Sequence, residues 1–164
     1  CCGVDLRVDR GWHHRRIHRW ERRRSGAEMI NSRDIDDLTP DTAEKCRAFV
    51  AACFRMGIDV LITSTYRSQK DQDILYSQGR SAPGRVVTNA KISYHSFKVA
   101  FDFVPIVAGK AVWNDHKVWN ACGAIAESCG LEWGGRWKAV DKPHCQNTQG
   151  FTIDDFLRGK ANVK

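Results

Sequence analysis

Long apolar segments are missing from this sequence. No run approaches the roughly 18–20 consecutive apolar residues that a membrane-spanning helix requires, and no secretion signal is visible at its start. Internal repeats and low-complexity segments are also absent outside the first 28 residues. These absences argue against a membrane protein and against a repeat protein. We therefore expect a soluble chain that is made without the secretion machinery.

Closely spaced cysteine pairs are missing too. The chain has 7 cysteines, but none forms a C-x-x-C motif, and the odd number leaves at least one thiol unpaired or paired between molecules. Cys46 and Cys53, like Cys122 and Cys129, are separated by two turns of an expected helix and so share a face. We expect reduced, mostly buried thiols that behave as small apolar residues. Disulfides or a thiolate metal site are the alternatives.

Positive charge is concentrated at the beginning of the chain. The net charge is +7, and residues 1–28 alone contribute +4 from eight arginines and four acidic residues. We interpret residues 1–28 as a basic extension rich in Arg, His and Trp, and residues 29–164 as one catalytic domain. The extension has three interpretations: a cloning or gene-start artefact, since Met29 is the first methionine; a polyanion-binding arm; or an ordinary ordered extension.

Helices and short strands alternate irregularly in the remaining sequence. Apolar spacing and capping residues predict helices that begin after Thr39, Ser68 and Thr152, and apolar spacing predicts another over residues 115–130. Strands are expected at 59–65 and 99–104, after a hairpin turn near 108–110, and on both sides of a loop between 131 and 146. No regular βαβ repeat is present. The sequence therefore predicts an α+β fold, a small, mainly antiparallel sheet with flanking helices.

One strand contains an unexpected carboxylate. Residues 99–104 alternate as a buried strand does, yet Asp102 lies in the middle, where an unpaired charge costs several kcal/mol. His95 precedes it by seven residues, and the "DKPH" segment supplies Asp141 and His144. Two histidines and one aspartate can hold zinc and leave a fourth position for water. A dication would compensate Asp102, although a structural role for the histidines stays open, because the chain has 6 of them.

Three blocks resemble one known family. "SYHSFKVAFD" at 93–102 is similar to the S-x-H-x-x-G-x-A-x-D signature of the D-Ala-D-Ala carboxypeptidase-like zinc peptidases. "EWGGRWKAVDKPHCQ" at 132–146 resembles the family's G-G-x-W segment followed by D/E-x-x-H, and "STYRSQKDQDILYSQGR" at 64–80 resembles its S-x-Y-R-S-x-x-x-Q segment. The family includes peptidoglycan carboxypeptidases, D-Ala-D-Ala dipeptidases and phage endolysins that cut the L-alanyl–D-glutamate bond. Its fold is the hedgehog/DD-peptidase-like zinc peptidase fold.

The resemblance implies one catalytic Zn²⁺ and a set of functional residues. The implied metal ligands are His95, Asp102 and His144. Asp141 would be the general base and acid that takes a proton from water and passes it to the leaving amine. The remaining implied roles concern charge and substrate: Arg67 as cationic stabiliser, and Ser93 and Gln72, with Arg67, as substrate-binding groups.

Each implied role has a simpler alternative. Arg67 can form an ordinary ion pair, Ser93 can shape the turn before His95, and Gln72 can pack a helix on a strand. Asp141 can be a loop residue, since Asp-Lys-Pro is a common turn composition. Two tryptophans are equally consistent with the core and with the wall of a groove: Trp133 and Trp137.

One position departs from the family signature. Lys98 stands where the family has glycine, a residue that usually marks a special backbone angle or a close approach. We expect Lys98 to take an ordinary strand conformation or to point its amine at solvent or substrate. The specific hypothesis is that Lys98 lies at the rim of the cleft and contacts an acidic group of the peptide stem.

The resemblance implies attack on bacterial peptidoglycan, its expected partner, and we expect the enzyme to be a monomer. We favour an endolysin that cuts the L-alanyl–D-glutamate bond, made in the host bacterial cytoplasm and acting on the wall after release to the periplasm, because no signal peptide is visible. The alternative on the same fold is a D-Ala-D-Ala carboxypeptidase. A more remote alternative is a nucleic-acid or polyanion-binding protein acting through residues 1–28. No specific nucleic acid is expected, whereas the extension is a candidate for contact with anionic membrane or lipopolysaccharide.

Overall fold

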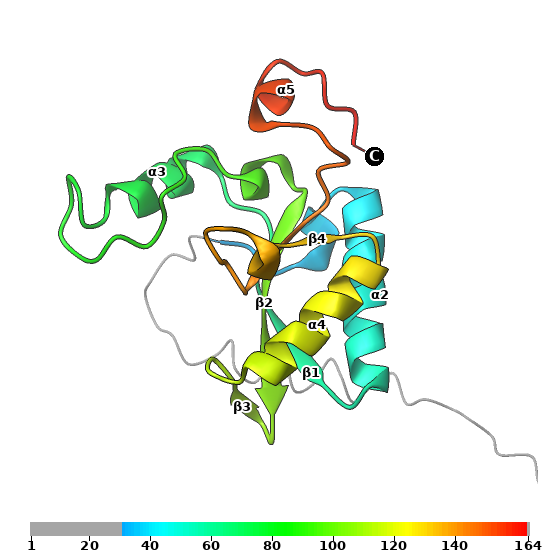
Figure 1. Ribbon diagram of the computed structural model, residues 1–164. Coiled ribbons are helices and arrows are strands. Elements are labelled where there is room, and N and C mark those ends of the chain that lie inside the picture. Colours follow the sequence, from blue (N-terminus) through cyan, green and yellow to red (C-terminus); the bar gives the residue numbers. More distant parts are fainter. Residues whose placement is uncertain (1–30, 164) are drawn as a thin grey trace, which may run out of the picture.

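The computed structural model describes residues 31–163 (Figure 1). The basic extension 1–28 lies outside the described residues, so its three interpretations stay open. In chain order the elements are η1 (Ile35–Asp37), α2 (Pro40–Arg55), β1 (Asp59–Ser64), α3 (Gln69–Ser77), η2 (Tyr94–Phe97), β2 (Ala100–Val107), β3 (Lys110–Ala111), α4 (His116–Ser128), β4 (Glu132–Trp133), η3 (Gly134–Arg136), β5 (His144–Gln146) and α5 (Ile153–Leu157).

The strands form one antiparallel sheet. Its order is β1-β2-β5-β4, and the short β3 pairs with the far end of β2. The register between β1 and β2 shifts between Ile62 and Ser64, so that Ser64 pairs with Asp102. The predicted α+β fold with a small antiparallel sheet is confirmed, and β2 is longer than the predicted strand because it continues into the β3 hairpin.

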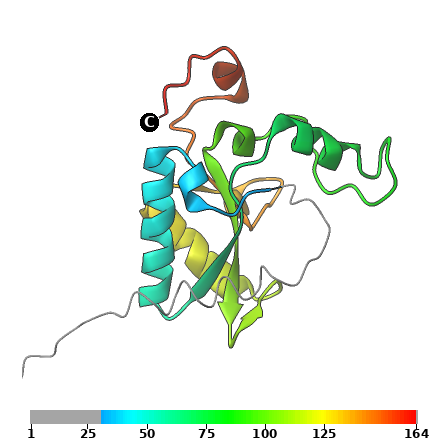
Figure 2. The same cartoon turned by 180° about the vertical axis from the view of Figure 1, so that it is seen from behind.

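Two helices cover one face of the sheet and form the core with it. Figures 1 and 2 show α2 and α4 side by side against the sheet. Phe49 of α2 packs against Phe103 of β2, with ring centroids 4.8 Å apart, and the ring centroid of Trp119 of α4 lies 5.2 Å from that of Phe103. All three side chains are buried. Each such burial contributes about 1.5–3 kcal/mol. The α2–α4 layer therefore fixes which face of β2 is apolar.

The predicted helix starts are mostly confirmed. Ser68 caps α3, Asp115 caps α4, and Thr152 forms a capping box with Asp155 at α5. Thr39 stands at the N-cap of α2, with Pro40 next, but its hydroxyl contacts Thr42 Oγ1 at 2.8 Å and caps no backbone N–H. The fixed φ of Pro40, and not a side-chain cap, thus marks this helix start.

The described cysteines are free thiols in or beside the core. Cys46, Cys53, Cys122 and Cys145 are buried, and Cys129 is half-buried. This confirms the predicted burial for four of these five residues, and their reduced state stays a prediction. Burial raises the pKa of Cys46 to about 12, which keeps its thiol protonated and unreactive.

The helix α3 and the loop after it extend away from the α2–α4 layer (Figures 1 and 2). The loop returns to the body of the protein through residues 87–92, just before η2 and β2. None of the helices between residues 31 and 163 is both long and apolar enough to cross a bilayer.

Candidate metal centre and cleft

Asp102 lies on the face of β2 opposite the helical layer. Its neighbours Phe101 and Phe103 point into the core, and side chains alternate along a strand, so Asp102 points away from it. In the antiparallel register His144 of β5 stands directly across from Asp102. Strand pairing therefore brings together two residues that are 42 positions apart in the sequence.

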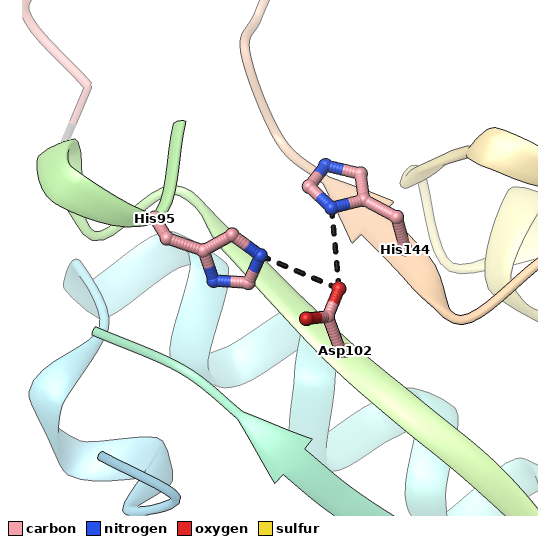
Figure 3. A group of neighbouring side chains, drawn as sticks. All are labelled: His95, Asp102 and His144. Atoms are coloured by element: carbon pink, nitrogen blue, oxygen red, sulfur yellow. Dashed lines mark hydrogen bonds and ion pairs between the residues drawn. The ribbon is translucent and has the colours of Figure 1, made fainter. Parts of the chain in front are cut away.

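Two imidazoles meet the carboxylate of Asp102. His95 Nε2 and His144 Nδ1 each lie 3.3 Å from Asp102 Oδ1 (Figure 3). The candidate ligand atoms of the three residues all lie within 4.8 Å of one another. The short helix η2 carries His95 to this point, and Ser93 caps η2 by accepting a hydrogen bond from the His95 N–H at 3.4 Å.

Hydrogen bonds behind the rings orient both histidines. His95 Nδ1 donates to the backbone carbonyl of Thr65 at 2.6 Å, and His144 Nε2 lies 3.1 Å from Gln146 Oε1. In the neutral imidazoles the remaining nitrogens, which face Asp102, then carry lone pairs. Two such nitrogens and a carboxylate oxygen match the three protein ligands of a catalytic zinc site, so the residues present fit the ion.

Charge coupling holds Asp102 ionised despite its burial. Burial opposes ionisation, but hydrogen bonds from His144 and His95 outweigh it and keep the pKa of Asp102 well below its usual range. Burial likewise lowers the pKa of His144, but the hydrogen bond and charge of Asp102 leave that pKa raised above its ordinary value. A dication bound between the three side chains would likewise stabilise the ionised carboxylate of Asp102.

Arg67 lies beside the same carboxylate. Its Nη2 is 3.9 Å from Asp102 Oδ2, its Nη1 donates to Gln72 Oε1 at 2.8 Å, and its Nε donates to Asn31 Oδ1. Burial lowers the pKa of Arg67, which the charge of Asp102 partly offsets, but a guanidinium stays charged at any physiological pH. Arg67 lines the cleft as a fixed cation.

The prediction that Gln72 contacts substrate is wrong. Its side chain is 0% exposed and is not part of the cleft wall. Its amide accepts from Arg67 and donates to the carbonyl of Ala90 at 2.6 Å, so it joins α3 to the returning loop. Gln72 therefore affects the cleft only through Arg67 and the loop, close to its alternative interpretation as a packing residue.

Asp141 lines the cleft near His144. Its backbone N–H donates to the carbonyl of Gly134 at 2.9 Å, and a Cβ on Gly134 would stand only 2.5 Å from the Asp141 carbonyl oxygen. Burial raises the pKa of Asp141; the charge of His144 opposes this increase and that of Asp102 adds to it. A carboxylate with a raised pKa is a better proton acceptor near neutral pH.

The two tryptophans divide between core and cleft. Trp133 is 3% exposed, and its indole N–H donates to the carbonyl of Lys142 at 2.8 Å. Trp137 is 36% exposed, lines the cleft, and lies 5.3 Å from the ring of His144. Trp133 thus belongs to the core and holds the loop that carries Asp141, whereas Trp137 forms a wall.

The cleft has a volume of about 620 Å³ on this face of the sheet. It brings together most of the predicted site residues: Arg67, Ser93, His95, Asp102, Asp141 and His144. Sequence analysis missed other lining residues, among them Leu75, Val87, Thr88, Tyr94, Gln146 and Ile153. Adjacency to His95 and His144 could have pointed to Tyr94 and Gln146, but the loop residues carry no periodic signal.

Lys98 preserves the backbone of the family glycine. It ends η2 in the left-handed region, with φ 62° and ψ 25°, and not in the expected strand conformation. Its amine lies 5.2 Å from the ring centroid of Tyr66, and Lys98 is not part of the cleft wall. The structure therefore gives no support to the hypothesis of a rim contact with the peptide stem.

Comparison with known proteins points to one family. Residues 87–147 match the family model described as D-alanyl-D-alanine carboxypeptidase. The peptidoglycan L-alanyl-D-glutamate endopeptidase CwlK of Bacillus subtilis is 36% identical over 141 residues, covering 79% of this chain and 83% of that protein. The L-alanyl-D-glutamate peptidase of Listeria phage A118 is 34% identical over 133 residues, covering 78% of this chain but only 44% of the phage protein.

Solved structures share the fold. The L-Ala D-Glu endopeptidase ChiX of Serratia marcescens superposes with a TM-score of 0.57 at 22% identity, covering 77% of this chain and 90% of that one. The LD-carboxypeptidase LdcB superposes with a TM-score of 0.56 at 16% identity, covering 74% of this chain and 63% of that one. These two structures show the shared fold, while the identity to the Bacillus protein and the match to the family model establish that the chain is a peptidase and belongs to the D-alanyl-D-alanine carboxypeptidase-like family.

Proposed function

We propose that this protein is a zinc-dependent peptidoglycan peptidase that hydrolyses the L-alanyl–D-glutamate bond of the stem peptide. The observation that carries the proposal is the convergence of two imidazole nitrogens on Asp102 Oδ1, beside Asp141 and Arg67 in one cleft. The names of the Bacillus and phage relatives support this choice of bond.

Three side chains would hold the metal: His95 through Nε2, Asp102 through its carboxylate, and His144 through Nδ1. When bound, zinc would act as a Lewis acid and lower the pKa of water to about 7. The hydrogen bonds from His95 to the Thr65 carbonyl and between His144 and Gln146 keep both rings oriented before substrate arrives.

Asp141 would move the proton. It is not among the clustered ligand residues, so its carboxylate stays available to accept a proton from the attacking water. It would then deliver that proton to the amine nitrogen of D-glutamate as the peptide bond breaks. Its raised pKa favours both transfers near neutral pH.

Arg67 and Trp137 would position the peptide. Arg67 is held by Asn31 and Gln72 and presents a permanent charge, suited to a substrate carboxylate or to negative charge that develops on the carbonyl oxygen. Trp137 forms an apolar wall beside His144. Ser93 lines the cleft as well as capping η2, so a hydrogen bond to the substrate is compatible with its place.

A D-Ala-D-Ala carboxypeptidase is the second candidate, because the matching family model carries that description. The role as a phage endolysin acting on the wall after release to the periplasm is a further part of the proposal, and the phage relative supports it. The chain spans less than half of that relative, so the likeness covers only part of the phage protein.

The test is digestion of chemically defined peptidoglycan, with and without a zinc chelator, followed by mass spectrometry of the new termini. A new D-glutamate amine that disappears with chelator and returns with added zinc is the expected result. Released D-alanine would replace the proposal by the carboxypeptidase. Absence of cleavage by folded, zinc-loaded protein would overturn both.

A further inference from the structure

Behind His144 lies a chain of side-chain hydrogen bonds. On β5, His144 and Gln146 point to the same face of the sheet, and Gln146 is 6% exposed. Gln146 Nε2 donates to Glu132 Oε2 at 2.8 Å, and Thr148 Oγ1 donates to Glu132 Oε1 at 2.5 Å. Glu132 is the cross-strand partner of Gln146 on β4. The pairing of β4 with β5 thus places a carboxylate behind the glutamine.

The donors and acceptors in this series of hydrogen bonds can be arranged in only one consistent way. An ionised carboxylate only accepts hydrogen bonds, so Glu132 requires the amide NH₂ of Gln146 to face it. The amide oxygen of Gln146 must then face His144, where it lies 3.1 Å from Nε2. His144 Nε2 therefore carries the hydrogen, and in the neutral ring Nδ1 carries the lone pair that faces Asp102.

The two histidines are oriented by different means. The partner of His95 is the backbone carbonyl of Thr65, which no substitution removes. The partner of His144 is a side chain whose own direction depends on Glu132. Substitutions outside the metal ligands can therefore reverse the tautomer of His144 but not that of His95.

We propose that Gln146 and Glu132 are positioning residues that present His144 Nδ1 to the metal. The inference rests on the proposed zinc site and adds two residues to it. If Gln146 and Glu132 only joined β4 to β5, their hydrogen-bond direction would be irrelevant to metal binding. If they position His144, the direction decides zinc affinity, and losing such a partner typically weakens metal binding about 10–100-fold.

Three variants separate these cases. Glu132→Gln keeps the size and the hydrogen bond, but its amide can donate as well as accept, so Gln146 is free to turn its NH₂ toward His144. Gln146→Leu removes the acceptor altogether. The double variant Gln146→Glu with Glu132→Gln restores a single direction, because a carboxylate at position 146 accepts from His144 and from the new amide at 132.

The measurement is the zinc dissociation constant of each full-length protein by competition with a chromophoric chelator. We expect both single variants to bind zinc about 10–100-fold more weakly and the double variant to recover affinity close to wild type. Gln149→Leu is the matched control, because Gln149 donates to Asp41 and lies outside the cleft wall, and it should leave the affinity unchanged. Imidazole ¹⁵N spectra of the zinc-loaded proteins should show Nε2–H on His144 in the wild type and the double variant.

The outcomes are distinguishable. Equal zinc affinity in wild type, Glu132→Gln and Gln146→Leu overturns the positioning role while the zinc peptidase stands. The positioning role is also overturned if Glu132→Gln binds zinc weakly and the double variant does not recover zinc affinity, provided that circular dichroism shows both variants to be folded. Absence of zinc binding by the wild-type protein overturns the metal centre and this inference together.

Discussion

Asp102 carries its charge in the middle of a sheet because three basic side chains surround it. His95 and His144 contact one carboxylate oxygen, and Arg67 lies 3.9 Å from the other. A buried carboxylate without such partners would cost several kcal/mol. The same arrangement that makes the residue tolerable in the fold makes it suitable as a ligand, since it supplies the charge that a dication prefers.

The contact between Asp102 and His144 stabilises the metal-free protein only within a limited pH range. The lowered pKa of Asp102 adds stability above its ordinary value of 3.8, and this is lost as pH falls through the folded-state pKa. The raised pKa of His144 adds stability below 6.5 that is lost as pH rises through its folded-state pKa. With chelator present, the free energy of unfolding lost in His144→Gln should therefore be largest between about pH 4 and 6.5. Urea unfolding that gave the same loss at pH 5 and pH 9 would contradict this.

Asp141 should matter for turnover and not for metal binding. Asp141→Asn keeps the size of the side chain but removes the proton acceptor, which typically costs 100-fold to 10,000-fold in rate. We expect kcat on defined peptidoglycan to fall by about 100-fold or more, with zinc content unchanged because Asp141 is not among the clustered ligand residues. Loss of zinc from this variant would instead point to a ligand role.

Lys98 tests the cost of a left-handed lysine. That conformation costs an L-residue roughly 1–2 kcal/mol, and the contact with Tyr66 returns at most about 1 kcal/mol. Lys98→Ala keeps the strain and loses the contact, whereas Lys98→Gly removes the strain. We expect the glycine variant to be more stable than the alanine variant by about 1 kcal/mol in urea unfolding, with cleavage unchanged in both. An alanine variant as stable as the glycine variant would show that the strain is absent.

At the scale of elements, β5 joins the core to the cleft. Cys145 faces the helices, while His144 and Gln146 face the cleft, so three residues serve both sides of the sheet. The loop before β5 folds onto Gly134 and is held by the indole of Trp133. The place of Asp141 is thus determined by backbone contacts of a loop and not by a regular element.

Gly134→Ala should displace this loop. The added Cβ would stand 2.5 Å from the Asp141 carbonyl oxygen, a backbone atom that can move only with the loop. We expect a loss of stability of about 1–3 kcal/mol and a fall in kcat of at least 10-fold. Gly150→Ala is the control: its Cβ meets nothing within 4 Å, but its φ of +83° makes it strained. Equal kcat in the two variants at equal fractions folded would contradict the positioning role of Gly134.

At the scale of the whole molecule, the sheet separates a helical core from the cleft. The charge is divided as well, because residues 1–28 hold +4 of the net +7. All residues assigned to the proposed centre lie between Asn31 and Thr148. A polyanion-binding role of the extension, for membrane or lipopolysaccharide, remains a proposal separate from the chemistry.

Removing the extension would separate its proposed lipid contact from the proposed peptidase chemistry. A protein starting at Met29 should cleave purified peptidoglycan at the wild-type rate, because the site residues and their hydrogen-bond partners are retained. If the extension contacts anionic lipid, lysis of intact cells should fall and become less sensitive to salt. Equal lysis of intact cells by the truncated and full-length proteins would contradict the lipid contact. Slower cleavage of purified peptidoglycan by the truncated protein would contradict the separation of the extension from the peptidase chemistry.

The sequence by itself determined most of the helices and strands and pointed to the three residues that could hold a metal. Alternation around Asp102 and helical spacing of apolar residues are local properties, so β2, α2 and α4 could be predicted from them. The signature residues likewise carried the family and the residues that could hold zinc. Capping chemistry placed α3 and α5 to within a residue or two.

Only the tertiary structure decided which residues surround the site. Gln72 proved to be buried, Trp133 and Trp137 went to opposite sides of the sheet, and Gln146 came to lie against Glu132. Each of these outcomes depends on strand pairing and on a loop's path between residues that are distant in sequence. Such contacts leave no periodic trace along the chain, because they arise from packing and register and not from local conformation.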